Sequence, residues 1–488
     1  MTPDTTDGRE SLSAPAPLRA TAIVGVGSII TLALSVIAAK AYALLLGPAG
    51  VGLLALMQSL LNLGVMLASI GLSTTVIRAM ARALAGDRPL SSTRAVEQAS
   101  NLLGLLGGTV AAGLLIAMRE PIADAILGSP ARSRDVVLLS GALLLTVAAA
   151  VQVALLSGGH RVRAVATVSV VTGLAATGLG VTIVGIIGED GIAVAMLVTA
   201  GVQLASSWTA GRWRRTRRAT TEAGATVRAF KDLLMLGVPV TASHVVGSGA
   251  QLVVPIIVLQ VLGTADVGHF RAAGVISMGY LTVFLAALAQ DYLPRAARAR
   301  NQVVLGELVE RRMRLILGLG IPIILALLAS VPWLIDILYT SEFGPAREVL
   351  QWQLVGDLAR LPAWVLVLVL LARGRGGEYF GAELLGGAVL IGASLGGMLA
   401  MGLVGAGVGY AVSQVAYYAG VWMLVRRHVA TTPGRLQAVL LGTISAATIL
   451  LLAPVGTLER SIAFAIAAIV AAALAWPRLY QLHNAGRL

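Results

Sequence analysis

The chain has 488 residues, of which 57% are hydrophobic and 12% are charged, and its mean hydropathy is +0.87. Soluble domains carry about twice that share of charged residues, so the composition excludes a soluble protein and predicts a membrane protein. Cysteine is absent, which excludes disulfides, thiolate catalysis and cysteine metal sites. The basic residues behind the net charge of +13 lie in short loops between apolar segments, so we expect no nucleic acid partner.

Residues 1–20 are polar and carry no signal peptide, and we expect a cytoplasmic N-terminal tail there. Fourteen apolar segments follow, each long enough to cross a bilayer, which takes about 20 residues. In chain order they span residues 21–46, 49–77, 97–118, 136–157, 164–187, 191–210, 233–262, 267–290, 314–338, 349–372, 379–402, 404–425, 436–455 and 461–477. The sequence therefore predicts an all-α polytopic membrane protein with about 14 transmembrane helices.

The second half of the chain repeats the first. Residues 46–52 (LGPAGVG) reappear 216 residues later at 262–268 (LGTADVG). Repeated membrane halves are typical of secondary transporters, because a substrate path can form between two similar bundles. The predicted organisation is an N-terminal tail (1–20), an N-lobe of six helices (21–210), a basic cytoplasmic linker (211–232), a C-lobe of six helices (233–427), and two extra helices with a cytoplasmic tail (428–488).

Lysine and arginine are distributed unevenly among the connections. With the N-terminus inside, 28 of the 36 basic residues fall in cytoplasmic segments and five in external ones. This bias predicts that both termini face the cytoplasm. Because each lobe has an even number of helices, the lobes are expected to be parallel repeats, related by an axis normal to the membrane.

Three basic residues, Lys40, Arg271 and Arg360, fall within predicted spans. A charged side chain at bilayer depth costs roughly 2.5–3.5 kcal/mol on insertion scales, so it usually faces a cavity or a partner. Lys40 and Arg271 lie near the outer ends of their helices, where reaching the lipid head groups is an equal alternative. Arg360 lies near the midplane, where Asp357, three residues earlier, offers a structural ion pair as the alternative to a substrate contact.

Further charged residues lie at predicted inner helix ends, where most interface charges of membrane proteins are found: Arg78, Asp291, Arg295 and Glu97. Taken together with the residues within the spans, the candidate ligands for an anion are Arg271, Lys40, Arg78 and Arg360. The candidates for a gate or an ion pair are Asp357, Asp291, Arg295 and Glu97. The spans 21–46 and 233–262 contain no carboxylate. This balance of charge suits an anionic substrate and does not suit a lipophilic cation.

The sequence contains no recognisable enzyme site. A Walker-type phosphate loop is absent, and the five histidines do not cluster at metal-binding spacing. External connections are short, the longest being about residues 119–134. We therefore expect a transporter that needs no metal or cofactor.

Four short segments follow one another in a characteristic order: three that contain glycine, 44–58 (LLLGPAGVGLLALMQ), 268–277 (GHFRAAGVIS) and 402–410 (GLVGAGVGY), and one that does not, 290–295 (QDYLPR), which follows the second. In this order they resemble the polysaccharide (O-antigen) translocases of the multidrug/oligosaccharidyl-lipid/polysaccharide (MOP) exporter superfamily. The resemblance implies a V-shaped pair of six-helix lobes that work by alternating access. The two helices after residue 430 lie outside that two-lobe core.

The implied substrate is an oligosaccharide on undecaprenyl pyrophosphate, such as an O-antigen or exopolysaccharide repeat unit. It would be moved to the outer leaflet of a bacterial inner membrane, in the course of lipopolysaccharide or related polysaccharide biosynthesis. A glycan polymerase and a chain-length regulator are the implied protein partners. The resemblance to the related lipid II flippases implies that basic residues of the cavity, including one on helix 8, engage the pyrophosphate. Arg271 lies in that region, with Lys40 and Arg78 as companions by position.

Three other functions stay open. A multidrug cation antiporter of the same superfamily would be expected to carry ion-coupling carboxylates within 21–46 or 233–262, where there are none. A membrane glycan polymerase or ligase would be expected to show a large external loop with basic catalytic residues. A non-transporting scaffold for a glycan assembly complex is also compatible with the sequence.

Overall fold

The computed structural model describes residues 16–69, 71–85, 89–211, 224–299, 301–429 and 434–484. Within these ranges the chain is helical and contains no strand. The α-helices are α1 (Ala16–Ala68), α2 (Leu72–Ala85), α3 (Pro89–Ala117), α4 (Arg119–Leu127), α5 (Ser133–Gly158), α6 (Val162–Ile187), α7 (Gly191–Ala210), α9 (Ala225–Leu262), α10 (Thr264–Arg298), α11 (Gln302–Leu338), α12 (Ala346–Ala372), α13 (Gly376–Met401), α14 (Leu403–Val425), α15 (Gly434–Leu452) and α16 (Thr457–Asn484). Short 3-10 turns lie at η1 (Pro130–Arg132), η2 (Gly188–Asp190) and η3 (Ser341–Phe343).

The helices form a membrane-spanning bundle. Among the described residues, nine stretches are long and apolar enough to cross a membrane, and one of them, Val162–Ala210, holds both α6 and α7. Large apolar side chains cover much of the outer surface: Ile186, Leu399 and Ile469 are 79%, 71% and 70% exposed. Apolar surface of this extent needs lipid around it, so the protein is a multi-pass membrane protein.

Two helix reversals show the repeat in the backbone. Gly47 interrupts α1 at φ 63°, ψ −172°, and Gly263 separates α9 from α10 at φ 104°, ψ 177°. Only glycine adopts this combination without strain, because any Cβ would clash with the backbone. The two glycines are 216 residues apart, which is the spacing of the sequence repeat. Residues that are equivalent in the repeat therefore have similar backbone conformations here.

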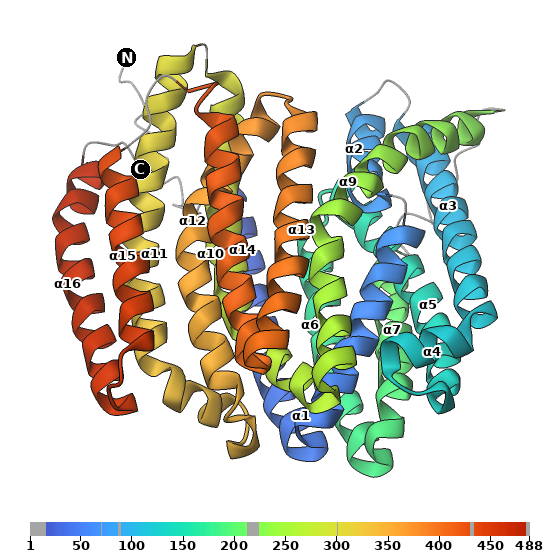
Figure 1. The fold of residues 1–488 in the computed structure, drawn as a ribbon. Helices are drawn as coiled ribbons and strands as arrows, with labels where there is room; N and C mark the ends of the chain where they lie inside the picture. Colours follow the sequence, from blue (N-terminus) through green and yellow to red (C-terminus); the bar gives the residue numbers. More distant parts are fainter. Residues whose placement is uncertain are drawn as a thin grey trace, which may run out of the picture.

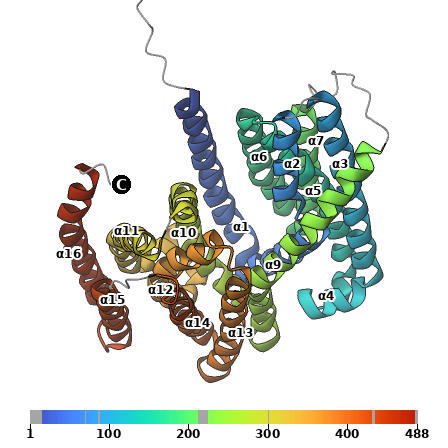
Figure 2. The same ribbon diagram turned by 90° about the horizontal axis from the view of Figure 1, so that it is seen from above.

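The helices are arranged as two lobes (Figures 1 and 2). The N-lobe contains α1–α7 and the C-lobe contains α9–α14, and the long first helix of each lobe, α1 or α9, lies between the remaining helices of the two lobes. α15 and α16 pack against α11 and α12 at the edge of the second lobe. We call the end at which α1 begins and α16 ends the terminal end, and the opposite end, with the Gly47 turn and α4, the distal end.

Several boundaries differ from the sequence predictions. The predicted span 49–77 breaks after Ala68 and resumes as α2 at Leu72, because Gly71 adopts a positive φ of 63° between them. The predicted linker 211–232 is partly helical, since α9 begins at Ala225; residues 212–223 lie outside the described residues.

Candidate functional site

The two lobes meet where the repeated glycine motifs cross near the distal end. A Cβ on Gly52 of α1 would overlap the carbonyl oxygen of Thr264, and a Cβ on Gly268 of α10 would overlap that of Pro48. Pro48 and Thr264 are equivalent under the 216-residue shift, as are Gly52 and Gly268. The contact is therefore reciprocal, and a pseudo-two-fold axis passes between α1 and α10.

Arg271 lies one helical turn from this crossing and links the lobes. Its Nη2 donates a hydrogen bond of 3.2 Å to Oε1 of Gln58 in the second half of α1, and the Arg271 side chain is exposed. Within the described part of the chain, Arg271 has no carboxylate partner. An amide oxygen does not neutralise a guanidinium, so the positive charge is available to an anion.

Lys40 has a different environment. Its Nζ donates to the carbonyl oxygen of Asp336 at 3.0 Å and to that of Tyr339, at the C-terminal end of α11. Unpaired carbonyls at a helix C-terminus attract cations, so Lys40 caps α11 and ties α1 to the C-lobe. Arg271 lies close enough to Tyr339 for electrostatic interaction, so both cations lie near this residue.

A buried polar network occupies the interior of the C-lobe. Asp357 of α12 is fully buried; its Oδ2 accepts from Ser277 of α10 at 2.6 Å and its Oδ1 accepts from the Tyr410 hydroxyl of α14 at 2.8 Å. The same hydroxyl accepts from Nη1 of Arg360 at 3.0 Å. Tyr410 therefore bridges the predicted partners Asp357 and Arg360.

A second carboxylate lies beside this network. Glu383 of α13 accepts a hydrogen bond of 2.6 Å from Tyr417 of α14, and Arg360 is close enough to attract it. Two carboxylates thus surround the one guanidinium, which offsets its charge. Arg360 is consequently less available to an anion than Arg271 is.

The remaining predicted residues lie elsewhere. Arg78 on α2 and Arg295 on α10 are exposed toward the terminal end, and Glu97 on α3 is half-buried. Arg295 is 24 residues along α10 from Arg271, which corresponds to about 36 Å at 1.5 Å per residue. The side chain of Asp291 lies outside the described residues.

Sequence reasoning missed three polar partners: Gln58, Ser277 and Tyr410. Each is the last residue of one of the glycine-rich segments 44–58, 268–277 and 402–410. Each also lies within a predicted apolar span, so a polar side chain in an otherwise apolar helix is the signal that could have found them. Among the described residues, no group of histidine and acidic side chains could hold a metal ion.

Comparison with known proteins agrees with this architecture. A family model described as polysaccharide biosynthesis protein matches residues 42–348, and the chain belongs to this family. No curated protein matches the sequence.

Three solved structures share the fold. The lipid II flippase MurJ in an inward closed conformation is 12% identical, with a TM-score of 0.66, over 95% of this chain and 99% of that one. An inward-facing multidrug resistance MATE transporter of the MOP superfamily is 17% identical, with a TM-score of 0.66, over 84% and 98%. A MOP superfamily transporter from Pyrococcus furiosus, noted for the reverse polarity of its binding pocket, is 14% identical, with a TM-score of 0.59, over 85% and 96%.

At these identities the likeness shows the fold alone. The predicted all-α fold of the MOP exporter type is confirmed.

Proposed function

We propose that the protein is a flippase that moves an undecaprenyl-pyrophosphate-linked oligosaccharide across a bacterial inner membrane by alternating access. The observation that carries the proposal is Arg271: an exposed guanidinium at the crossing of the lobes whose described partner, Gln58, is uncharged. The family description and the fold shared with a lipid II flippase support a lipid-linked glycan as the cargo.

The chemistry of the head group fits this arginine. A pyrophosphate cannot enter hydrocarbon unpaired, because the loss of its hydration is not compensated there. A guanidinium replaces part of that hydration with charge-assisted hydrogen bonds. The polyprenyl tail can stay in the bilayer while the head group passes between the lobes.

Binding at Arg271 also affects the contact between the lobes. The Arg271–Gln58 hydrogen bond joins α10 to α1, so an anion that takes over the guanidinium removes one link across the distal end. Hydrogen bonds from arginine to phosphate are roughly twice as strong as those between neutral groups, so phosphate competes well with the Gln58 amide. Substrate binding would thus loosen the distal closure and favour opening on that side.

The proposal also implies an orientation in the membrane. The terminal end would face the cytoplasm, as the distribution of basic residues predicts. A glycan polymerase and a chain-length regulator would then receive the product at the distal end. Lys40 caps α11 and Arg360 lies in the buried network, so both would mainly stabilise the fold rather than bind the substrate.

The proposal is tested with the purified full-length protein in proteoliposomes. Arg271→Gln should lower the initial rate of flipping of a lipid-pyrophosphate-linked glycan by about tenfold or more, because a lost charge-assisted bond is worth about 1.5–3 kcal/mol. Arg298→Gln makes the same change in charge at an exposed position of the same helix and should stay within about twofold of the wild type. Equal rates for wild type and Arg271→Gln would overturn the assignment.

A second candidate function is cation antiport. The observation that favours it is the pair of carboxylates, Asp357 and Glu383, in the C-lobe of a fold shared with MATE transporters. A deletion strain separates the two functions. A flippase mutant accumulates lipid-linked glycan on the cytoplasmic side and loses surface polymer, whereas an antiporter mutant becomes hypersensitive to drugs and keeps its surface glycan.

A further inference from the structure

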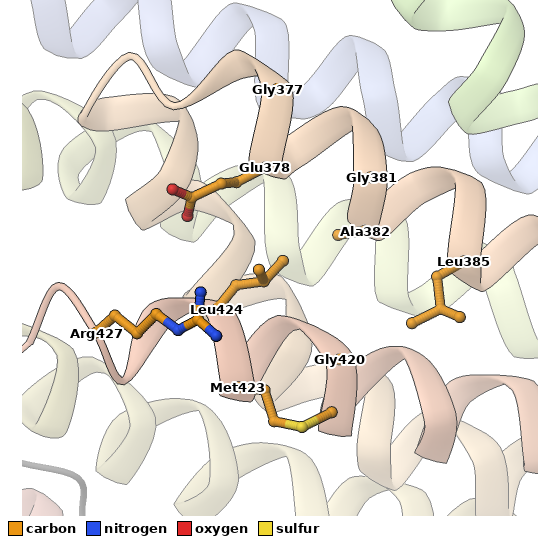
Figure 3. A pocket seen from close by; sticks show the side chains of 9 residues that line it. All are labelled: Gly377, Glu378, Gly381, Ala382, Leu385, Gly420, Met423, Leu424 and Arg427. Atoms are coloured by element: carbon orange, nitrogen blue, oxygen red, sulfur yellow. The ribbon is translucent and has the colours of Figure 1, made fainter.

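A cleft of about 450 Å³ opens between α13 and α14 toward the terminal end (Figure 3). It is lined by Gly377, Glu378, Gly381, Ala382, Leu385, Gly420, Met423, Leu424 and Arg427. Toward the distal end the same helices pack backbone to backbone, since a Cβ on Gly405 would overlap the carbonyl of Gly397. A Cβ on Gly377 or Gly381 would meet nothing within 4 Å, so the absence of side chains leaves the cleft open.

Among the residues that line the cleft, Arg427 is the one cation, and it lies at the mouth. Glu378 is already paired, with Nε2 of His428 at 2.8 Å and with Arg375 at 3.6 Å. Arg426 lies over the ring of Trp422, 5.1 Å from its centroid. Arg427 has neither an ion pair nor a side-chain hydrogen bond within the described ranges, and Figure 3 shows its side chain reaching over the cleft beside Leu424.

The lining changes from charged to apolar with depth. Arg427 lies two residues beyond the end of α14, at the level where a spanning helix leaves the membrane. Gly420 lies seven residues earlier, about 10 Å deeper along the helix axis, and faces Leu385 and Met423. A charged mouth above an apolar interior matches a molecule with an anionic head and a hydrocarbon chain.

We infer that this cleft binds an anionic phospholipid, with its phosphate on Arg427 and one acyl chain against Leu385 and Met423. The cleft is separate from the polar network of the C-lobe: Gly377, Gly381 and Leu385 form one stripe of α13, and Glu383 projects from nearly the opposite side of that helix. A bilayer phospholipid, present at high concentration at this depth, is therefore the occupant, and the inference does not depend on the transported substrate.

The inference is tested by lipid titration of the purified full-length protein, followed by native mass spectrometry. The probe is phosphatidylglycerol, compared with phosphatidylcholine of the same acyl chains. Arg427→Gln should weaken retention of phosphatidylglycerol by about tenfold, as expected for one charge-assisted contact. Arg426→Gln makes the same change in net charge at the neighbouring position and should leave retention within about twofold.

A second pair of variants tests the acyl-chain part of the cleft without changing charge. Gly381→Leu fills the cleft from a position where a Cβ has open space, and it should abolish the preference for phosphatidylglycerol. Gly396→Leu adds the same side chain to the same helix outside the cleft, also in open space, and should have no effect.

Equal loss of retention in Arg426→Gln and Arg427→Gln, or no preference for phosphatidylglycerol in the wild type, would overturn the inference. Displacement of phosphatidylglycerol by an equal concentration of undecaprenyl phosphate would assign the cleft to the polyprenyl lipid and would also overturn it.

Discussion

The hydroxyl of Tyr410 holds two opposite charges in place inside the C-lobe. A buried carboxylate is tolerated only when its oxygens accept hydrogen bonds, and each oxygen of Asp357 accepts one, from Ser277 and from Tyr410. The Tyr410 oxygen in turn accepts from Arg360. Removing that oxygen would therefore remove one contact from each charged group at once.

Tyr410→Phe should lower the free energy of unfolding by about 1–3 kcal/mol, the usual cost of leaving buried polar groups unsatisfied. The measurement is the thermal unfolding midpoint of the purified protein in detergent. Tyr379→Phe is the matched control, because no hydrogen bond from the Tyr379 hydroxyl is found within the described residues. Equal shifts for the two variants would contradict the bridging role.

Lys40 offers a second prediction at this scale. Lys40→Met keeps most of the side-chain stem but removes the ammonium that caps α11, and it should destabilise the protein by about 1.5–3 kcal/mol, the value of hydrogen bonds to a charged group. Thermal unfolding measures the loss. The chain's other lysine provides the control: Lys231→Met, at an exposed position on α9, should change the midpoint little, and a comparable loss there would refute the capping role.

At the scale of elements, the sequence predicts the helices and the repeat but not how the repeated motifs meet. The 216-residue shift identifies Gly47 and Gly263 as equivalents, and the backbone confirms them as matching reversals. The partner of Arg271 could not be predicted, because Gln58 lies 213 residues away and helical periodicity gives only the face of each helix. The same limit applies to Tyr410, 53 residues from Asp357.

The crossing of α1 and α10 depends on two glycines that allow backbone contact. Gly268→Ala, or equally Gly52→Ala, would push a methyl group into a carbonyl of the other lobe and should cost about 1–3 kcal/mol, as overpacking does. Chemical denaturation in detergent measures the cost. Gly274→Ala on the same helix is the control, since its Cβ meets nothing within 4 Å; an equal effect there would show that helix propensity, rather than the crossing, is responsible.

At the scale of the whole molecule, the reciprocal crossing and the Arg271–Gln58 bond hold the lobes together near the distal end. The proposed alternating access requires the lobes to separate there in another state. The absence of cysteine allows this separation to be followed by site-specific spin labels without other substitutions. Ala49 and Ala265 are exposed at the distal end, one in each repeat.

Spin labels at Ala49→Cys and Ala265→Cys should report how Gln58 controls the closure. Gln58→Glu replaces the amide with a carboxylate, strengthens the bond to Arg271 and should keep the distance between the labels short. Gln58→Ala removes the bond and should add a population at longer distance. Pulsed electron resonance measures the distributions, and identical distributions in wild type and both variants would rule out a link at Gln58.

The reciprocal backbone contact at Gly52 and Gly268 has the geometry of a symmetric homodimer, in which one surface patch of a subunit binds the same patch of a second copy. A half-length ancestor carrying this motif could therefore have assembled with itself before its gene was duplicated and fused. The two halves now differ in their polar contacts: the amides of Asn101 and Gln152 join α3 to α5 in the first half, whereas the second half holds the charged triad of Asp357, Arg360 and Glu383.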